Sequence, residues 1–255
     1  MKKVSILLLI FSFITLLLPP AAAVEEVKVA AFTFDDGPHK TITPELLDAL
    51  AERGVRATFF VNGKNAERYP EGHQIANHTY SHSQLTKLSS ESVTYEVSRT
   101  QDYLSELLGE DEYLVRVPYG AINERVKSLI DVPIIMWSVD PTSGRVMSSE
   151  RMRDGIVETA HDGAIILMHD TSRANLTASV EAIDLLLADG YTFVTVNELF
   201  EIKGAVPASG AVYYKLTGGN VGAFYDESHL ETHWAYDAIR FVQGADIMEG
   251  DARGF

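Results

Sequence analysis

The chain has 255 residues, a formal net charge of −15 at pH 7 and no cysteine. The strong negative charge excludes nucleic acid and other polyanions as partners, because like charges repel, and it favours a neutral or cationic ligand. Without cysteine there are no disulfides, so the hydrophobic core must hold the fold, and the length suffices for one substantial domain plus a fragment.

Residues 1–23 have the three parts of a secretory signal peptide. Lys2 and Lys3 precede an apolar run over 4–18, and three alanines follow at 21–23. Such a run is too short for a comfortable membrane span, so we expect cleavage near Val24 and a secreted, extracellular or cell-wall-associated protein. An uncleaved membrane anchor is the alternative. Cleavage would remove both lysines and take the formal net charge to −17.

Seven short apolar runs predict strands. They are Val27–Phe34, Ala57–Val61, Gln74–His78, Tyr113–Pro118, Val132–Val139, Ala164–Asp170 and Tyr191–Val196. Several are continuously apolar, which is typical of strands buried on both faces of a parallel sheet. Apolar stripes between them predict three helices. The first has Thr43 as its N-cap and stops at Gly54, and the others end at Gly109 and Gly190.

This alternation predicts an α/β fold over residues 27–203, a distorted or incomplete (β/α) barrel of about seven parallel strands. An open doubly wound sheet is the alternative. The connection over 62–73 has no apolar stripe, so we expect no full helix there. Glycine, alanine and a proline make 204–222 a predicted linker, and 223–255 reads as a short C-terminal helical fragment without its own core.

Polar side chains gather where the predicted strands end. In parallel strands these ends share one rim, which is where α/β barrels build their active sites. The residues at this rim are Asp35, Asp36, His78, Arg116, Asp140, His169 and Asp170. We therefore expect one polar site at this edge.

His78 and His82 are four residues apart, the spacing of one helical turn, so both can face a common point. Together with a carboxylate from another strand they would form a His-His-Asp site with open positions, as a hydrolytic Zn²⁺ centre requires. A pair of surface histidines is the plainer interpretation.

Asp35 and Asp36 end the first predicted strand, where neighbouring side chains point to opposite sides. One aspartate is expected to bind the metal and the other to act as a base for the attacking water. An Asx turn with two solvated acids is the alternative. Arg116 can hold the base ionised, and His169 has the pKa range of a general acid. A surface arginine and a satisfied core histidine are the alternatives for these two.

Four of these segments resemble the motifs of the polysaccharide deacetylase family, the NodB-homology domain of the family 4 carbohydrate esterases. The resemblance covers about Val27 to Ile202. Its first motif corresponds to Thr-Phe-Asp-Asp-Gly-Pro at 33–38 and its second to His-Thr-Tyr-Ser-His at 78–82. The third corresponds to Arg-Val-Pro-Tyr-Gly at 116–120 and the fifth to Leu-Met-His-Asp at 167–170.

The resemblance implies metal-dependent removal of acetyl groups from N-acetylglucosamine-type or other acetylated polysaccharides. It makes Asp36, His78 and His82 the metal ligands, with Zn²⁺ expected and Co²⁺ or Ni²⁺ as alternatives. Asp35 is then the base. Arg116 would orient Asp35, the Tyr119 N–H would hold the oxyanion, Leu167 would line the acetyl pocket and His169 would be the acid.

The sequence departs from the family pattern in three places. Val117 replaces the first proline of the third motif, and the fourth motif keeps only Asp140, without its second acid and its tryptophan. Asp140 is the remaining candidate to tune His169. The segment before His78 lacks a usual helix, and this could shift both histidines.

Residues 223–255 resemble the first half of an S-layer homology repeat, which implies attachment to a cell-wall polymer. An ordinary amphipathic terminal helix is the alternative. The predicted function is a secreted deacetylase that releases acetate from peptidoglycan-like or chitin-like glycans. An acetylxylan O-esterase and a catalytically impaired wall-glycan-binding protein are the alternatives. The sequence does not indicate an oligomeric state.

Overall fold

The computed structural model describes residues 27–63, 72–109 and 112–217. The predicted signal peptide, the predicted C-terminal fragment and most of the connection before the third strand lie outside these residues. Over the described ranges, no helix combines the length and the apolar character that a membrane crossing requires.

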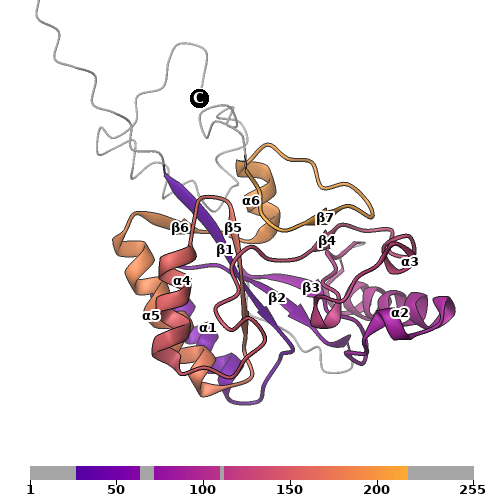
Figure 1. Ribbon diagram of the computed structural model, residues 1–255, viewed down its shortest axis with the longest axis horizontal. Helices are drawn as coiled ribbons and strands as arrows, with labels where there is room; N and C mark the ends of the chain where they lie inside the picture. The colour runs from indigo at the N-terminus through magenta and orange to yellow at the C-terminus, as the bar shows by residue number, and fades with distance from the viewer. Residues whose placement is uncertain (1–26, 64–71, 110–111, 218–255) are drawn as a thin grey trace, which may run out of the picture.

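Five parallel strands form the central sheet: β1 (Lys28–Asp35), β2 (Thr58–Val61), β3 (Gln74–Asn77), β5 (Ala164–His169) and β6 (Tyr191–Phe193). The order is β3-β2-β1-β5 (Figure 1). β5 pairs with one edge of β1. On the other edge, β1 pairs with β2 through its C-terminal half and with β6 through its N-terminal half. β1 is thus enclosed on both edges, which fixes the position of its last residue.

Single bridges extend this sheet into an incomplete barrel. Val115 bridges Asn77 on one side and Ile134 on the other, and Val139 bridges Ile166 in β5. Ile134 belongs to the short strand β4 (Ile134–Ile135). Because β5 also pairs with β1, this series of neighbouring segments closes back on β1. The predicted incomplete α/β barrel is therefore confirmed. Where strands were predicted over 113–118 and 132–139, the structure has only these bridges and β4.

Helices cover the outside of the barrel. They are α1 (Ile42–Glu52), α2 (Ser90–Leu108), α3 (Glu124–Lys127), α4 (Ser149–Thr159), α5 (Arg173–Ala188) and α6 (Val196–Ile202), with 3₁₀ turns η2 (Leu85–Lys87) and η3 (Pro118–Gly120). α1, α4 and α5 lie together on one flank, and α2 and α3 lie on the opposite flank (Figure 1). α2 begins after its cap Ser89 and ends at Gly109, which has a φ of +82°.

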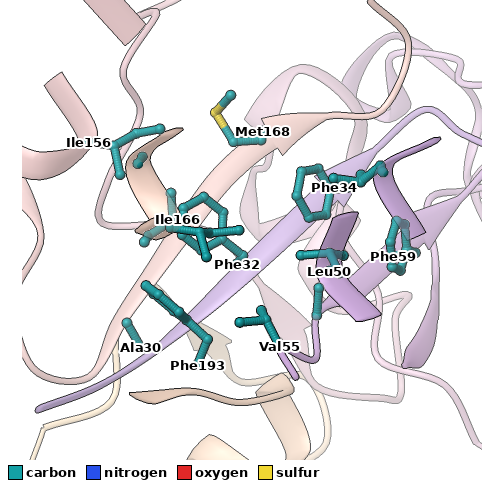
Figure 2. Close-up of a cluster of buried hydrophobic side chains, with 14 of the residues drawn as sticks. Ala30, Phe32, Phe34, Leu50, Val55, Phe59, Ile156, Ile166, Met168 and Phe193 are labelled. Atoms are coloured by element: carbon teal, nitrogen blue, oxygen red, sulfur yellow. The ribbon is translucent and has the colours of Figure 1, made fainter. Parts of the chain in front are cut away.

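The side chains of β1 alternate between two cores. Phe32 and Phe34 pack outward against the helices, in the cluster shown in Figure 2. Ala31 belongs to a second cluster with buried residues of the facing strands. Because strand side chains alternate, Thr33 and Asp35 share the inward face of Ala31. The fold therefore carries Asp35 into the barrel.

Two sequence predictions need correction. Thr43 is not an N-cap: α1 begins at Ile42 after Thr41, and the Thr43 hydroxyl instead bonds the Asp170 carboxylate. The segment from 204 to 217 is not a linker. Val212 and Tyr213 form β7 and pair with β4, because their apolar side chains complete the barrel edge. Residues 218–222 lie outside the described part.

Candidate metal and hydrolytic site

The two adjacent aspartates separate at the end of β1. Asp35 is the last strand residue and is 3% exposed, whereas Asp36 has a φ of 75° and leaves the strand. The left-handed turn at Asp36 provides the bend that two neighbouring acids need to face one site. Asn62 Nδ2 donates to the Asp36 carbonyl at 3.2 Å and holds this turn.

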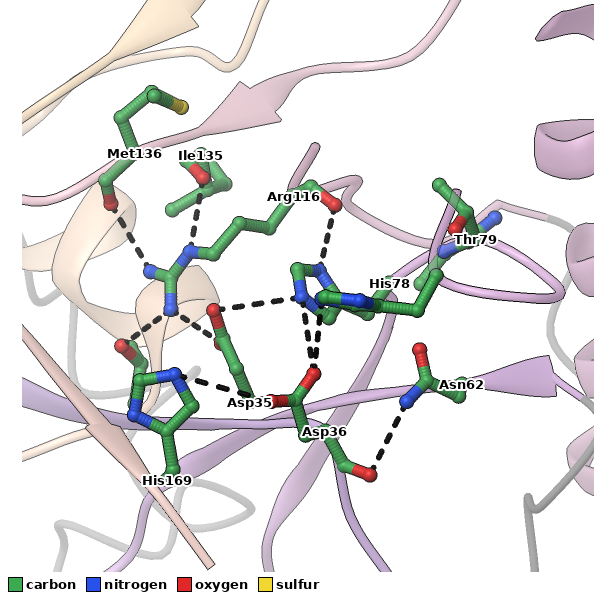
Figure 3. A network of polar contacts seen from close by, with 12 residues as sticks. Asp35, Asp36, Asn62, His78, Thr79, Arg116, Ile135, Met136 and His169 are labelled. Atoms are coloured by element: carbon green, nitrogen blue, oxygen red, sulfur yellow. Dashed lines mark hydrogen bonds and ion pairs between the residues drawn. The ribbon is translucent and has the colours of Figure 1, made fainter. Parts of the chain in front are cut away.

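Arg116 is the electrostatic centre of the site (Figure 3). Its side chain is 0% exposed, and Nη1 donates to Asp35 Oδ1 at 2.7 Å and to Thr33 Oγ1 at 2.7 Å. Nε and Nη2 donate to the carbonyl oxygens of Ile135 and Met136 at 3.1 and 3.0 Å. A buried guanidinium with this many acceptors is fixed in one orientation, so it presents Asp35 Oδ2 to the site.

His78 and His82 approach Asp36, as predicted, but not through a helical turn. Residues 78–82 form an irregular loop with Thr79 at φ 66° and His82 at φ 60°. His78 Nε2 lies 3.6 Å and His82 Nε2 lies 3.1 Å from Asp36 Oδ1. One ligand atom from each of these three residues lies within 4.8 Å of the others. The convergence therefore comes from a specific loop.

These three side chains fit a divalent metal. Nδ1 of His78 lies 2.8 Å from the Arg116 carbonyl oxygen, which can only accept, so Nδ1 carries the proton and Nε2 keeps its lone pair. Burial lowers the pKa of His78, which favours the neutral imidazole that a metal needs. Asp36 Oδ1 is buried and accepts no hydrogen bond from any residue that the structure describes. An unsatisfied carboxylate oxygen beside two imidazole nitrogens matches a Zn²⁺, Co²⁺ or Ni²⁺ site.

His169, Leu167 and Tyr119 border this cluster. In the register of the two strands His169 pairs with Asp35 and Leu167 pairs with Thr33, and His169 Nε2 lies 3.9 Å from Asp36 Oδ2. Tyr119 is 68% exposed, and its ring lies 4.7 Å from the His82 ring. Tyr119 has a φ of 61°, and over the described ranges its backbone N–H donates to no carbonyl.

Asp140 does not join the group. Its Oδ1 accepts from Thr142 N, Thr142 Oγ1 and Ser143 N, so this oxygen caps its own turn. Over the described residues, no hydrogen bond or ion pair links it to His169. The other two departures leave the site assembled: Val117 is buried in the core, and both histidines reach Asp36.

Sequence reasoning missed Thr33 as a supporting residue of the site, and it placed Asp170 at the rim without giving it a role. The Thr33 hydroxyl accepts from Arg116 and donates to the Ile166 carbonyl at 2.7 Å. Alternation along β1 places Thr33 on the face of Asp35, and this was the available signal. Asp170 is 1% exposed and packs against Gly37, where an added Cβ would lie 2.2 Å from Asp170 Oδ2. Burial raises the pKa of Asp170 to about 6.

The fold and site define the class: an α/β barrel with a predicted metal-ligand triad, a buried aspartate and a histidine at the carboxyl rim. The family model described as polysaccharide deacetylase matches residues 23–132. The chain is 35% identical over 186 residues to a peptidoglycan-N-acetylglucosamine deacetylase of Bacillus cereus, covering 67% of this chain and 68% of that protein. The chain therefore belongs to the polysaccharide deacetylase family, and the sequence resemblance is confirmed.

Two further relatives connect the chain to solved structures. It is 38% identical over 184 residues to the peptidoglycan-N-acetylmuramic acid deacetylase PdaC of Bacillus subtilis, covering 69% of this chain. A structure of PdaC matches with a TM-score of 0.66 at 36% identity, covering 72% of this chain and 94% of that chain. A family 4 acetyl xylan esterase from Clostridium thermocellum, in complex with a cobalt ion, matches at 26% identity and a TM-score of 0.67, covering 74% and 99%. The chain spans 39% of the length of PdaC.

Proposed function

We propose that this protein is a secreted, metal-dependent polysaccharide deacetylase that hydrolyses N-acetyl groups of N-acetylglucosamine-type glycans to acetate and free amine. The observation that carries the proposal is the placement of Asp36, His78 and His82 beside the Arg116-held Asp35. The names of the relatives support the polysaccharide substrate. The signal peptide, secretion and wall attachment through residues 223–255 remain predictions.

Asp36, His78 and His82 would hold the metal. When bound, a divalent cation there supplies a Lewis acid that polarises the acetamide carbonyl and makes water more acidic. Zn²⁺ is our preferred assignment, and Co²⁺ or Ni²⁺ suit the same ligands.

Asp35 is the proposed base. Its Oδ1 is bound to Arg116, and its Oδ2 faces the site, 3.8 Å from His78 Nε2. Oδ2 therefore takes the proton of the water that attacks the carbonyl carbon. Arg116 keeps the carboxylate charged and correctly aimed before this step.

His169 and Tyr119 complete the proposed reaction on the leaving-group side. The backbone N–H of Tyr119 donates to the oxygen that becomes negatively charged in the tetrahedral intermediate. His169 then gives a proton to the amide nitrogen as the carbon–nitrogen bond breaks, which yields the free amine and acetate. Leu167 would line the pocket for the acetyl methyl group. For Asp140 we retain only the prediction that it tunes His169, with no contact to support it.

Acetate release tests this proposal. Purified protein loaded with Zn²⁺ or Co²⁺ should release acetate from chito-oligosaccharides and peptidoglycan. Asp35→Asn should lower the rate by about 10²- to 10⁴-fold and leave metal binding intact. No acetate from any of these substrates, at full metal occupancy, would contradict the proposal.

An acetylxylan O-esterase is the second candidate, and the similarity to a solved structure named as a family 4 acetyl xylan esterase supports it. Acetylated xylan offered beside chito-oligosaccharides separates the two activities. Glycan binding that is unaffected by Asp35→Asn, without acetate release from either substrate, would instead favour the wall-glycan-binding alternative.

A further inference from the structure

The loop that carries His82 cannot hold its shape alone. We call residues 79–82 the histidine loop. Its first and last residues both have left-handed φ angles, 66° for Thr79 and 60° for His82. Each such conformation is unfavourable for a non-glycine residue and persists only where neighbouring groups impose it.

Glu96 on α2 accepts three hydrogen bonds from this loop. Its carboxylate accepts from the Ser81 backbone N at 2.7 Å through Oε2, and from the Ser81 hydroxyl at 2.6 Å through Oε1. Its backbone carbonyl accepts from Tyr80 N at 3.0 Å. One residue of α2 therefore holds two consecutive loop residues, directly before His82.

Glu96 lies on a largely apolar stripe of α2, which also holds the buried Thr100. Glu96 is 8% exposed and shares this stripe with Val93, Val97 and Leu104. Burying a carboxylate is costly unless it is hydrogen-bonded or paired with a cation. In the part of the chain that the structure describes, no basic side chain forms an ion pair with Glu96. The Ser81 bonds are thus what compensates its burial.

We propose that Glu96 is a positioning residue for the metal site, acting through Ser81 to place His82 Nε2 beside Asp36 Oδ1. The inference rests on the proposed metal site but not on the proposed deacetylation. Loss of the carboxylate would free the loop to relax from its left-handed conformation. His82 would then leave the position 3.1 Å from Asp36 Oδ1.

Co²⁺ binding to the full chain tests this proposal, with the visible absorption spectrum of the bound ion as a second readout. We expect Glu96→Ala to weaken Co²⁺ binding by about 10- to 100-fold and to change the spectrum. Glu96→Gln should recover most of the affinity, because an amide oxygen can still accept from Ser81 N. Asp102→Ala, an exposed acid on the same helix, is the matched control and should bind Co²⁺ like the wild type.

A milder variant covers the case in which Glu96→Ala does not fold. Ser81→Ala removes the hydroxyl bonds to Glu96 Oε1 and to Ser83 Oγ but keeps the bond from Ser81 N to Oε2, so we expect a few-fold loss of Co²⁺ affinity in a folded protein. If folded Glu96→Ala, or Ser81→Ala where Glu96→Ala does not fold, binds Co²⁺ with wild-type affinity and spectrum, the proposal is overturned. A wild type that fails to bind Co²⁺ would also overturn it. A wild type that binds Co²⁺ but releases no acetate would contradict only the proposed function.

Discussion

The two halves of the site are held by different structural elements, one by a paired strand and the other by a loop. Asp35 lies on a strand with partners on both edges, and Arg116 beside it is fully buried. His82 lies on a loop, and its side chain is 25% exposed. We call these the strand half and the loop half. The proposed base is held by the sheet itself, whereas the proposed metal ligands converge through a few side-chain bonds, so damage to each half should have a different signature.

Removal of Arg116 should have the largest effect on stability. Arg116→Ala leaves Asp35 as a buried charge without a partner, so the free energy of unfolding should fall by about 3 to 5 kcal/mol. Urea denaturation measures this change. Arg116→Lys keeps the charge but loses the fork geometry, and should lie in between. A loss below about 1 kcal/mol for Arg116→Ala would show that the sheet alone fixes Asp35.

Asp170 adds a second acid, with a pH signature, to the strand half. Burial raises its pKa from 3.8 to about 6, so between these values the native state binds more protons than the unfolded state. The Asp170 contribution to stability is therefore greatest below pH 4 and falls as pH rises to 6, by about 3 kcal/mol at most.

Asp170→Asn should remove this dependence. We expect the variant to gain stability relative to the wild type as pH increases from 4 to 7. The comparison is made by denaturation at several pH values. Equal pH slopes for the two proteins would show that Asp170 does not titrate in this range.

Thr33 should matter less than Arg116, because Arg116 Nη1 keeps its bond to Asp35 when the Thr33 hydroxyl is absent. Thr33→Val removes one bond to a charged donor and one to the Ile166 carbonyl, so we expect a loss of about 1 to 3 kcal/mol. Thr33→Ser keeps the hydroxyl and is the control. Equal stability of the valine and serine variants would show that the Thr33 hydroxyl does not stabilise the strand half.

His82→Ala should have the smallest effect on the metal-free protein, within about 0.5 kcal/mol of the wild type. The stability gained on adding Zn²⁺ should then differ between the wild type and the variant. At Zn²⁺ 100-fold above its dissociation constant, the wild type gains about 2.7 kcal/mol, and the variant should gain far less. Thermal melts with and without Zn²⁺ measure this. A large loss in the metal-free variant would mean that the loop half also supports the fold.

Strand ends were predictable from sequence, and so was the rim they form. Asp35, Arg116 and His169 follow largely apolar runs, His78 follows the short mixed segment 74–77, and parallel strands bring such ends together. The number of paired residues around Val115 was not predictable. A segment buried on both faces has the same apolar sequence whether it forms a single bridge or a full strand. The linker prediction failed because composition describes a whole segment, while the pairing of 204–217 depends on a few apolar residues such as Val212 and Leu216.

The histidine loop shows a different limit. The four-residue spacing of His78 and His82 predicted their convergence, but the conformation that produces it is not a helix. Glu96 was hidden within an amphipathic pattern, where it appears as one more polar residue. Its position on the stripe of Val93 and Val97 was the signal, because a charge on a buried face needs a partner.

Arg116 serves both halves through different atoms. Its guanidinium holds Asp35, and its main-chain carbonyl holds His78 Nδ1. A codon change can alter the guanidinium but not the carbonyl. The proposed roles in hydrolysis and in metal retention are thus genetically separable at this position. A descendant that lost the arginine side chain would lose the support of Asp35, the proposed base, while the tether on His78, a proposed metal ligand, remained.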